Sequence, residues 1–460
     1  MEKKVIKISE MNGTNENVIE DKKNLYLLLN FSKNYISSSI VEYSVEQHKI
    51  SILGYTKDET DGIFNGQIQN IDKVNSSLKK NLIKLKKVAN LNSFEKVEVF
   101  CNISPIIGKK TTANGVVNFI DNEVTKKDIN EVITKALHAT NIPDNMKLIN
   151  LKINKFKIDN NWVSNPLGMN CQRLEVDATV QIINNSYYNN FNKVLLTNGL
   201  KNSLMRFETD NIIDASLNEE EKELGAILIY VSDSYTKVSF VKNSELVNEI
   251  SILKGKNTII ENISNTFKIS FKISKYILEH LSLISKNANN LGYFEIEKSD
   301  GKVQSINFNL LIDTISDTLI DIFNEVKMEI KNDNGVNNYL NGLIFLKTLD
   351  IEGIDEFFND MFKNEIKDIR SFKNLITKQD NILNVEMLNN EFALLGMINL
   401  ILNEKEFNYN HNVQLIGDVI VQNNNIKNIS ELRNDLSNLD LTGKKESFFS
   451  KITKMAKELW

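Results

Sequence analysis

The chain has 460 residues, of which 41% are hydrophobic and 25% charged, and its formal net charge is −5. This length allows two or more lobes with sizeable cores, and the near-balanced charge argues against a global basic field for nucleic acid. Cys101 and Cys171 form no CxxC pair, so we expect a reducing cytoplasm and no disulfide framework. The four histidines are scattered, so no metal site is expected. No run of about 18 apolar residues is present to span a bilayer.

The first hundred residues predict a flexible tail, an antiparallel meander and a helix. Residues 1–23 are polar and charged, as mobile termini usually are. Runs of apolar and β-branched residues predict three strands, over 24–31, 37–44 and 49–56. Apolar residues at helical spacing then predict a helix over 72–91, and 96–104 is typical of a buried strand.

Residues 105–180 predict a compact insert of about one helix and three strands. The helix is expected over 125–142, with Thr125 as N-cap and Asp128 at position N3. The strands are expected over 115–120, 147–159 and 172–183. A further helix is expected near 187–208.

The second half of the chain begins with a predicted hairpin over 223–241. Its turn is Ser232, Asp233 and Ser234, a turn composition without glycine. Mostly helical segments follow, with one strand between them, over 257–285, 307–330, 342–350 (the strand), 354–364 and 390–402. Strand meanders that are each closed by helices predict a two-lobed α/β protein.

The last forty residues predict a tether that ends in an interfacial helix. Residues 421–444 are polar with few large apolar side chains, as in linkers. Over 445–460 a helix would have one apolar and one basic face. The apolar face contains Phe448, Phe449, Ile452, Met455, Leu459 and Trp460, and the basic face contains Lys451, Lys454 and Lys457. This pattern predicts a helix lying on an anionic membrane surface. A helix docked on its own domain would explain the apolar face but not the tether or the lysines.

Four segments of the sequence carry a resemblance to one known family. The most specific is "NPLGMNCQRLEVDATV" (165–180), and the others are "GIFNGQIQNIDKV" (62–74), "EKELGAILI" (221–229) and "EFALLGMINL" (391–400). They resemble segments of the bacterial cell-division protein FtsA, an actin-like protein that tethers FtsZ to the inner membrane, and the first is similar to that family's NPLGM…RLEV stretch. The resemblance implies a two-lobed actin-like fold, of the actin, Hsp70 and sugar-kinase type. It also implies an FtsA-type inserted αβ subdomain and a C-terminal amphipathic helix.

The resemblance implies the following domains: 1–23 tail, 24–104 first part of the first lobe, 105–180 insert, 181–222 second part of the first lobe, 223–420 second lobe with an upper subdomain near 257–335, 421–444 linker and 445–460 membrane-targeting helix. In the upper subdomain, Thr318 and Asp321 lie where the family's helix carries an Arg and a Glu that contact the FtsZ peptide. The arginine is missing here. Leu311, Ile315, Leu319 and Ile322 of the same helix are expected to face the core.

The family's nucleotide motifs are not matched. Glycines allow backbone N–H groups to approach phosphates, and aspartates order the metal and water. The positions that correspond to these motifs are Asn30 and Ser32 in the first hairpin; Tyr230, Ser232, Asp233, Ser234, Thr236 and Lys237 in the second; and Lys347, Thr348 and Leu349 in the adenosine segment. Asp233 would add a charge that repels a polyanion by about 4 kcal/mol per charge pair at 4 Å and a dielectric of 20, and Lys237 would offset one such charge. We therefore expect no ATP, no other cofactor and no catalytic residue.

The sequence predicts a cell-division scaffold that binds the FtsZ C-terminal peptide, self-associates into filaments and attaches peripherally to the cytoplasmic side of the membrane at the division site. Tyr230, Tyr235 and Leu349 are expected to fill the cleft between the lobes in place of nucleotide. Two alternatives stay open, an actin-like ATPase with unconventional nucleotide contacts and a cytoplasmic pilus-assembly-type protein. The missing glycines argue against the first and the C-terminal helix argues against the second.

Overall fold

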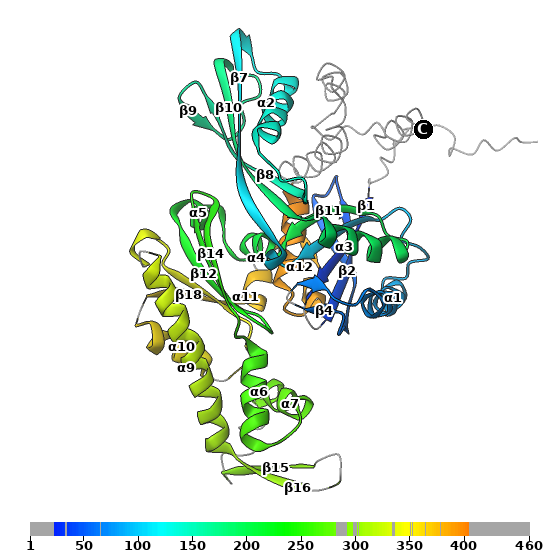
Figure 1. The fold of residues 1–460 in the computed structure, drawn as a ribbon, viewed down its shortest axis with the longest axis vertical. Helices are drawn as coiled ribbons and strands as arrows, with labels where there is room; N and C mark the ends of the chain where they lie inside the picture. Colours follow the sequence, from blue (N-terminus) through cyan, green and yellow to red (C-terminus); the bar gives the residue numbers. More distant parts are fainter. Residues whose placement is uncertain are drawn as a thin grey trace, which may run out of the picture.

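The computed structural model describes residues 23–403, except 33–34, 65, 282–291, 298–300, 302, 334–335, 350, 352, 364 and 378. Two large mixed sheets form the body of the molecule, and a third sheet belongs to the insert at one end (Figure 1). The predicted tether and C-terminal helix lie outside the described residues. None of the helices in the described ranges is both long and apolar enough to span a membrane.

The first two sheets share one topology. The first has the strand order β11-β6-β1-β2-β3-β19, and the second has the order β14-β13-β12-β17-β18. In each sheet an antiparallel meander of three strands is extended by parallel strands on the side of its first strand. Parallel pairing requires a crossover connection, which the insert and helices supply here. The prediction of a two-lobed α/β fold is confirmed by these two sheets.

The strands of these sheets agree with most of the predictions. The first sheet contains β1 (Lys23–Phe31), β2 (Tyr35–Ser44), β3 (Lys49–Glu59), β6 (Glu98–Ile103), β11 (Asn202–Phe207) and β19 (Ile382–Leu383). The second contains β12 (Ala226–Val231), β13 (Thr236–Lys242), β14 (Glu245–Ile252), β17 (Leu343–Lys347) and β18 (Ile366–Ser371). Helix α1 (Ile71–Val88) covers the first sheet, and its buried side chains are Val74, Leu78, Asn81, Leu82 and Leu85.

The insert is a four-stranded sheet with one helix. Its strands β7 (Gly108–Glu123), β8 (Met146–Ile158), β9 (Asn161–Val163) and β10 (Asn170–Asn184) pair in the order β7-β10-β8-β9. Helix α2 (Lys126–Ala139) packs on one face, and the predicted capping box between Thr125 and Asp128 is present. Gly115 allows this close packing, because a Cβ there would lie 2.1 Å from the Val132 carbonyl oxygen.

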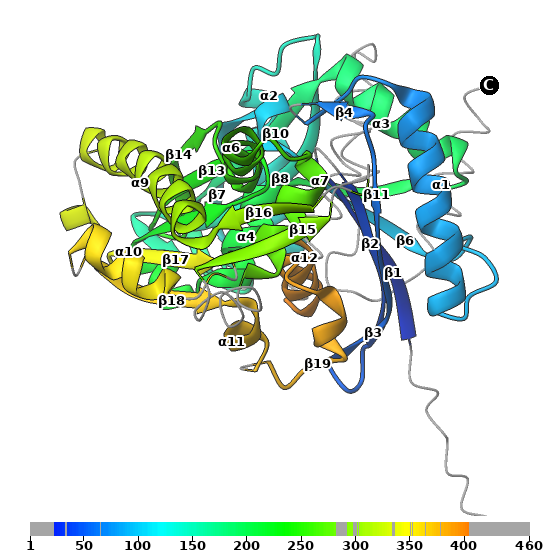
Figure 2. The same cartoon turned by 90° about the horizontal axis from the view of Figure 1, so that it is seen from below.

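Two helices lie between the large sheets. Apolar side chains of α4 (Glu208–Ser216) and α12 (Phe392–Leu402) share one buried cluster with β1–β3 on one side and β12 and β17 on the other. Figure 2 shows α12 between β1–β3 and β17–β18. Gly396 makes the α4–α12 crossing possible, since a Cβ there would lie 1.7 Å from the Asn211 carbonyl oxygen. This crossing joins the two halves of the protein.

Two boundary predictions are wrong. The helix expected near 187–208 ends at Thr197 as α3 (Asn185–Thr197), and the chain then forms β11 before α4 and the short α5 (Glu219–Leu224). The second lobe does not extend to residue 420, because β19 pairs with β3 and α12 packs on α4. In both cases tertiary pairing overrides the local pattern.

The upper subdomain extends from the second sheet at the end away from the insert (Figure 1). It contains α6 (Lys256–Phe267), α7 (Phe271–Glu279), the hairpin of β15 (Tyr293–Glu297) and β16 (Val303–Asn307), and the long helix α9 (Phe308–Asn332). Leu311, Ile315, Leu319 and Ile322 of α9 are buried, as predicted. Helix α10 (Ile354–Phe362) follows, and the short α11 (Phe372–Ile376) leads back to the first sheet.

Candidate functional site

The β1–β2 and β12–β13 hairpins contain the positions that correspond to the family's two phosphate-binding motifs. Each turn is closed by the same bond, in which a serine N–H donates to a tyrosine carbonyl three residues later. The distances are 3.0 Å from Ser32 N to Tyr35 O and 2.8 Å from Ser232 N to Tyr235 O. The two hairpins therefore have equivalent positions in the two sheets and share this closing hydrogen bond.

Several backbone groups of the second turn form hydrogen bonds within the protein. Ser232 Oγ accepts hydrogen bonds from Ser234 N at 3.3 Å and Tyr235 N at 3.2 Å. The carbonyl oxygens of Ser232 and Asp233 accept from Lys256 N at 3.0 Å and Asn257 N at 2.8 Å, which begin α6. The backbone N–H groups that a phosphate loop would offer to an anion are thus occupied by a side chain of the loop itself.

Side chains of the second hairpin also contact α4, which directly follows the edge strand β11 of the first sheet. Tyr235 Oη donates a hydrogen bond to Glu208 Oε2. Lys237 Nζ donates to Thr209 Oγ1 at 2.6 Å and lies 3.0 Å from Glu249 Oε1 on β14. Lys237 is only 2% exposed, so its charge is compensated inside the protein and is not available to an anion. Lys237 therefore neutralises Glu249 and does not have the expected role of offsetting the charge of a bound anion.

A second carboxylate network lies beside the first hairpin. Glu391, immediately before α12, accepts hydrogen bonds from Asn30 Nδ2 and Tyr55 Oη, each at 3.2 Å. Lys57 Nζ lies 3.3 Å from Glu391 Oε1 and 3.4 Å from the centre of the Tyr35 ring. Asn30 is 2% exposed. Its amide therefore serves as a structural donor at the position where the family's first hairpin has an aspartate.

The electrostatics place both networks in one neighbourhood. Burial raises the pKa of Tyr230 well above its ordinary value, and the carboxylates of Glu208 and Glu391 raise it further. Burial likewise raises the pKa of Tyr35 and Tyr235. Burial also raises the pKa of Glu208, although the Lys237 ammonium opposes this shift. The tyrosines therefore remain hydroxyl donors at neutral pH.

The remaining expected positions have structural contacts. Tyr230 is partly buried, with its ring 6.1 Å from that of Phe392. Lys347 Nζ pairs with Asp355 at 2.9 Å, and Thr348 Oγ1 donates to the Val231 carbonyl at 2.7 Å. Thr236 Oγ1 donates to the Lys254 carbonyl at 2.8 Å. Leu349 is 4% exposed in the core under α9 and α10, so the expectation that it fills the cleft is wrong.

The residues present do not fit a Mg·ATP site. In the second hairpin Ser234 N and Tyr235 N bond to Ser232 Oγ, Lys237 pairs with Glu249, and Tyr235 bonds to Glu208. Ser234 Oγ is buried and has no hydrogen-bond partner in the described part of the chain, which leaves one hydroxyl donor at the turn. Nor do the described residues contain any cluster of three His, Cys, Asp or Glu side chains suited to a metal.

The comparisons with known proteins agree with this architecture. Residues 109–182 match the family model for the SHS2 domain inserted in FtsA. Cell division protein FtsA of Neisseria meningitidis serogroup B is 26% identical over 324 residues, which cover 69% of this chain and 77% of that protein. Cell division protein FtsA of Staphylococcus epidermidis is 25% identical over 348 residues, covering 72% and 73% respectively. The chain is a relative of FtsA.

A solved structure extends the comparison to the fold. The PilM-PilN type IV pilus biogenesis complex aligns with a TM-score of 0.53 at 11% identity, covering 81% of this chain and 98% of that one. This likeness concerns the fold alone, which is the actin-like fold with the FtsA-type insert. The matched residues of the family model coincide with β7, α2, β8, β9 and most of β10.

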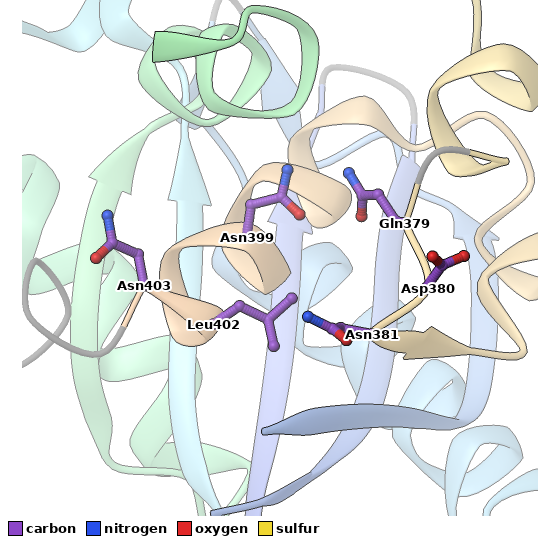
Figure 3. A pocket seen from close by; sticks show the side chains of 6 residues that line it. All are labelled: Gln379, Asp380, Asn381, Asn399, Leu402 and Asn403. Atoms are coloured by element: carbon purple, nitrogen blue, oxygen red, sulfur yellow. The ribbon is translucent and has the colours of Figure 1, made fainter. Parts of the chain in front are cut away.

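A pocket of about 520 Å³ lies at the opposite end of α12 from Glu391, next to the turn before β19 (Figure 3). It is lined by Gln379, Asp380, Asn381, Asn399, Leu402 and Asn403. Its lining is amides, one carboxylate and one leucine, without a basic group for phosphate. Of its lining residues, Asn399 belongs to the segment 391–400 that resembles FtsA, but none is at a position that corresponds to the nucleotide motifs.

The two α9 positions expected to contact a peptide differ in exposure. Thr318 is 4% exposed, and its Oγ1 accepts from Asn262 Nδ2 at 2.9 Å and donates to the Thr314 carbonyl. Its hydroxyl therefore joins α9 to α6 and is not available to a partner. Asp321 is exposed and pairs with Lys254 at 2.8 Å. Of these two positions, only Asp321 is available on the surface.

The sequence missed Glu208, Glu391 and Lys57, which carry the two polar networks. No local motif marks them, because Glu391 lies 361 positions from its partner Asn30 and Glu208 lies 27 from Tyr235. Their one available signal was position, since Glu208 follows a strand directly and Glu391 opens the resembling 391–400 segment.

Proposed function

We propose that this FtsA relative is a cell-division scaffold that holds FtsZ filaments at the cytoplasmic face of the membrane without binding or hydrolysing ATP. The observation that carries the nucleotide part is the second hairpin, whose backbone donors bond to Ser232 Oγ and whose Tyr235 contacts Glu208. The proposed role in cell division is supported by the FtsA relatives, which match 69–72% of the chain. An unconventional ATPase would need donors that this hairpin uses internally.

In this proposal, protein contacts take the role that bound nucleotide has in other actin-like proteins. Tyr235–Glu208 and Lys237–Thr209 join the second sheet to the helix that follows the first sheet. Because these groups are permanent parts of the chain, the lobes stay in one relative position. The protein then acts as a constitutive filament subunit, with no nucleotide switch.

Attachment to the membrane is assigned to residues 445–460 by their sequence pattern. The lysines add about 1 kcal/mol each near an anionic leaflet. A single short helix binds weakly, so self-association would supply the several copies that stable attachment needs. This makes the expected location peripheral, on the cytoplasmic side of the membrane at the division site. The FtsZ peptide site is assigned to the upper subdomain, with Asp321 on its surface.

The decisive experiment is thermal denaturation with and without Mg·ATP. A ligand at 100 times its Kd adds about 2.7 kcal/mol to the free energy of unfolding, so a bound nucleotide raises the Tm measurably. We expect no change with ATP or ADP, and a rise for an FtsA with complete glycine motifs as the positive control. A saturable rise for this chain would overturn the nucleotide part of the proposal.

Two further measurements test the scaffold part. The full chain should sediment with anionic vesicles and a chain ending at residue 444 should not. Equal sedimentation of both would refute the proposal that residues 445–460 attach the protein to the membrane. A chain ending at residue 444, which lacks the amphipathic segment, should bind the FtsZ C-terminal peptide in a fluorescence anisotropy titration. Absence of binding at high micromolar protein concentration would refute the proposal that this protein tethers FtsZ.

A further inference from the structure

Helix α9 carries an exposed stripe that no described element covers. Along its 25 residues, positions 310, 313, 317, 320, 321, 324 and 328 recur at spacings of three and four and therefore share one face. Leu310, Ile320 and Met328 on this face are 48%, 40% and 59% exposed. The stripe is about 27 Å long at 1.5 Å per residue. The apolar side chains lie on one face at intervals of two to three turns, with Asp313 and Asp317 between the first two.

The stripe is also acidic. Asp313, Asp317 and Asp321 alternate with its apolar residues and are exposed. Lys254 is the neighbouring cation, 2.8 Å from Asp321 and paired with Glu325 as well. Asp317 and Asp313 lie about one and two turns further toward the start of the helix, where the stripe keeps its negative charge. A helix with an apolar face rimmed by lysines would complement this surface in both respects.

The chain itself contains such a segment. Residues 445–460 place Phe448, Ile452, Met455 and Leu459 on one helical face, flanked by Lys451, Lys454 and Lys457. We propose that this segment docks on the α9 stripe when no membrane is available. The inference rests on the proposed membrane role of the segment. Its consequence is that membrane attachment and exposure of the α9 surface are coupled.

The length of the intervening chain allows the contact. The last described residue, Asn403, is followed by 41 residues before residue 445. A flexible chain of that length has a root-mean-square span of about 35 Å, comparable with the length of α9, whose 25 residues span about 37 Å. Tethering then gives an effective concentration in the millimolar range, so a weak contact between two helices is sufficient to keep the segment docked.

The contact would couple membrane attachment to binding of the partner peptide, because the stripe includes Asp321 of the proposed peptide site. A docked tail covers Asp321 and hides the apolar residues beside it from a partner peptide. An anionic membrane competes for the same apolar face and the same lysines of the tail. Binding to the membrane therefore uncovers α9, and the scaffold becomes able to bind its partner only at the membrane surface.

Disulfide trapping in the full chain tests the docking directly. Met328→Cys with Leu459→Cys should form an intramolecular disulfide under mild oxidation, whereas Leu196→Cys with Leu459→Cys, on the exposed surface of α3, should not. The native cysteines do not interfere, because Cys101 is 0% and Cys171 5% exposed. Anionic phosphatidylglycerol vesicles should abolish the disulfide. Equal trapping at positions 196 and 328 would overturn the proposal.

Charge reversal gives a second readout. Asp313→Lys with Asp317→Lys should reduce the trapping and increase the affinity for anionic vesicles about tenfold, which corresponds to about 1.4 kcal/mol. The matched control is Glu46→Lys with Glu95→Lys, two exposed positions in the first lobe that change the net charge equally. Equal vesicle affinity of both double variants would contradict the docking.

The outcomes separate this inference from the proposed function. If trapping occurs but the full chain never binds vesicles, the docking stands and the membrane role fails. If the chain binds vesicles but trapping is absent, the docking alone fails. Mixing two singly substituted chains distinguishes a second copy as the occupant, since a disulfide that forms only between chains and depends on concentration would overturn the intramolecular contact.

Discussion

Tyr235 donates a hydrogen bond to the Glu208 carboxylate, joining the second hairpin to the helix that follows the first sheet. The contact lies where the two halves of the fold meet. Burial raises the pKa of Glu208 and so disfavours its charge, whereas the Lys237 ammonium and the Tyr235 hydroxyl favour the charged form. The tyrosine hydroxyl therefore both satisfies a buried acceptor and connects the two sheets.

Tyr235→Phe should lower the free energy of unfolding by about 1–3 kcal/mol, because it leaves a buried carboxylate without its donor. Urea denaturation followed by circular dichroism measures the change. Tyr276→Phe is the matched control, since Tyr276 is 60% exposed and stacks on His280 by its ring. A loss no larger than that of the control would mean that the hydroxyl contact does not stabilise the closed arrangement.

Lys237→Met should lower the free energy of unfolding by more, about 3–5 kcal/mol. The substitution removes the positive charge that pairs with Glu249 and leaves that carboxylate without a counter-charge. The double variant with Glu249→Gln should recover part of this loss, since neither side then keeps an unpaired charge. A double-mutant cycle by urea denaturation gives the coupling energy. Additive losses would show that Lys237 acts through packing alone.

Gly396→Ala should destabilise the protein by more than about 3 kcal/mol. In an isolated helix the same change stabilises by about 0.5–1 kcal/mol, so the two effects have opposite signs. The new Cβ would lie 1.7 Å from the Asn211 carbonyl oxygen and would force α4 and α12 apart. Thermal denaturation distinguishes the outcomes, and a rise in Tm would mean that this crossing is not close.

Acid should destabilise the protein through a buried ion-pair network around α4. Burial alone would raise the pKa of Asp214, but the Arg206 guanidinium, 2.7 Å away, and the Lys222 ammonium lower it overall. Asp210 behaves in the same way beside Lys110. A lowered folded pKa gives stability that is fully present above the unfolded pKa near 4 and is lost as pH falls below it.

The loss from one strongly shifted carboxylate is on the order of 2–3 kcal/mol. Urea midpoints at pH 7, 5, 4 and 3 should stay level to pH 5 and then fall steeply. Asp214→Asn should lower stability at pH 7, because Arg206 is left without its counter-charge, and should flatten the decline below pH 5. An unchanged slope in this variant would exclude Asp214 as a source of the acid sensitivity.

Much of the fold follows from local patterns in the sequence. The opening meander, the α1 stripe, the Thr125–Asp128 capping box and the buried face of α9 were all predicted, because each depends on residues within one or two turns of each other. The β12–β13 hairpin, with a turn free of glycine, belongs to the same class. The insert was delimited at 105–180, and the family model matches 109–182.

Only the tertiary structure decided the rest. It returned β19 and α12 to the first sheet, made β11 a strand where a helix was expected, and placed Leu349 in a core and not in the cleft. It also brought Glu208 and Glu391 to the hairpins from distant positions in the chain. Local propensity is set by neighbours in sequence, whereas strand pairing and buried carboxylate networks are set by partners that only folding brings together.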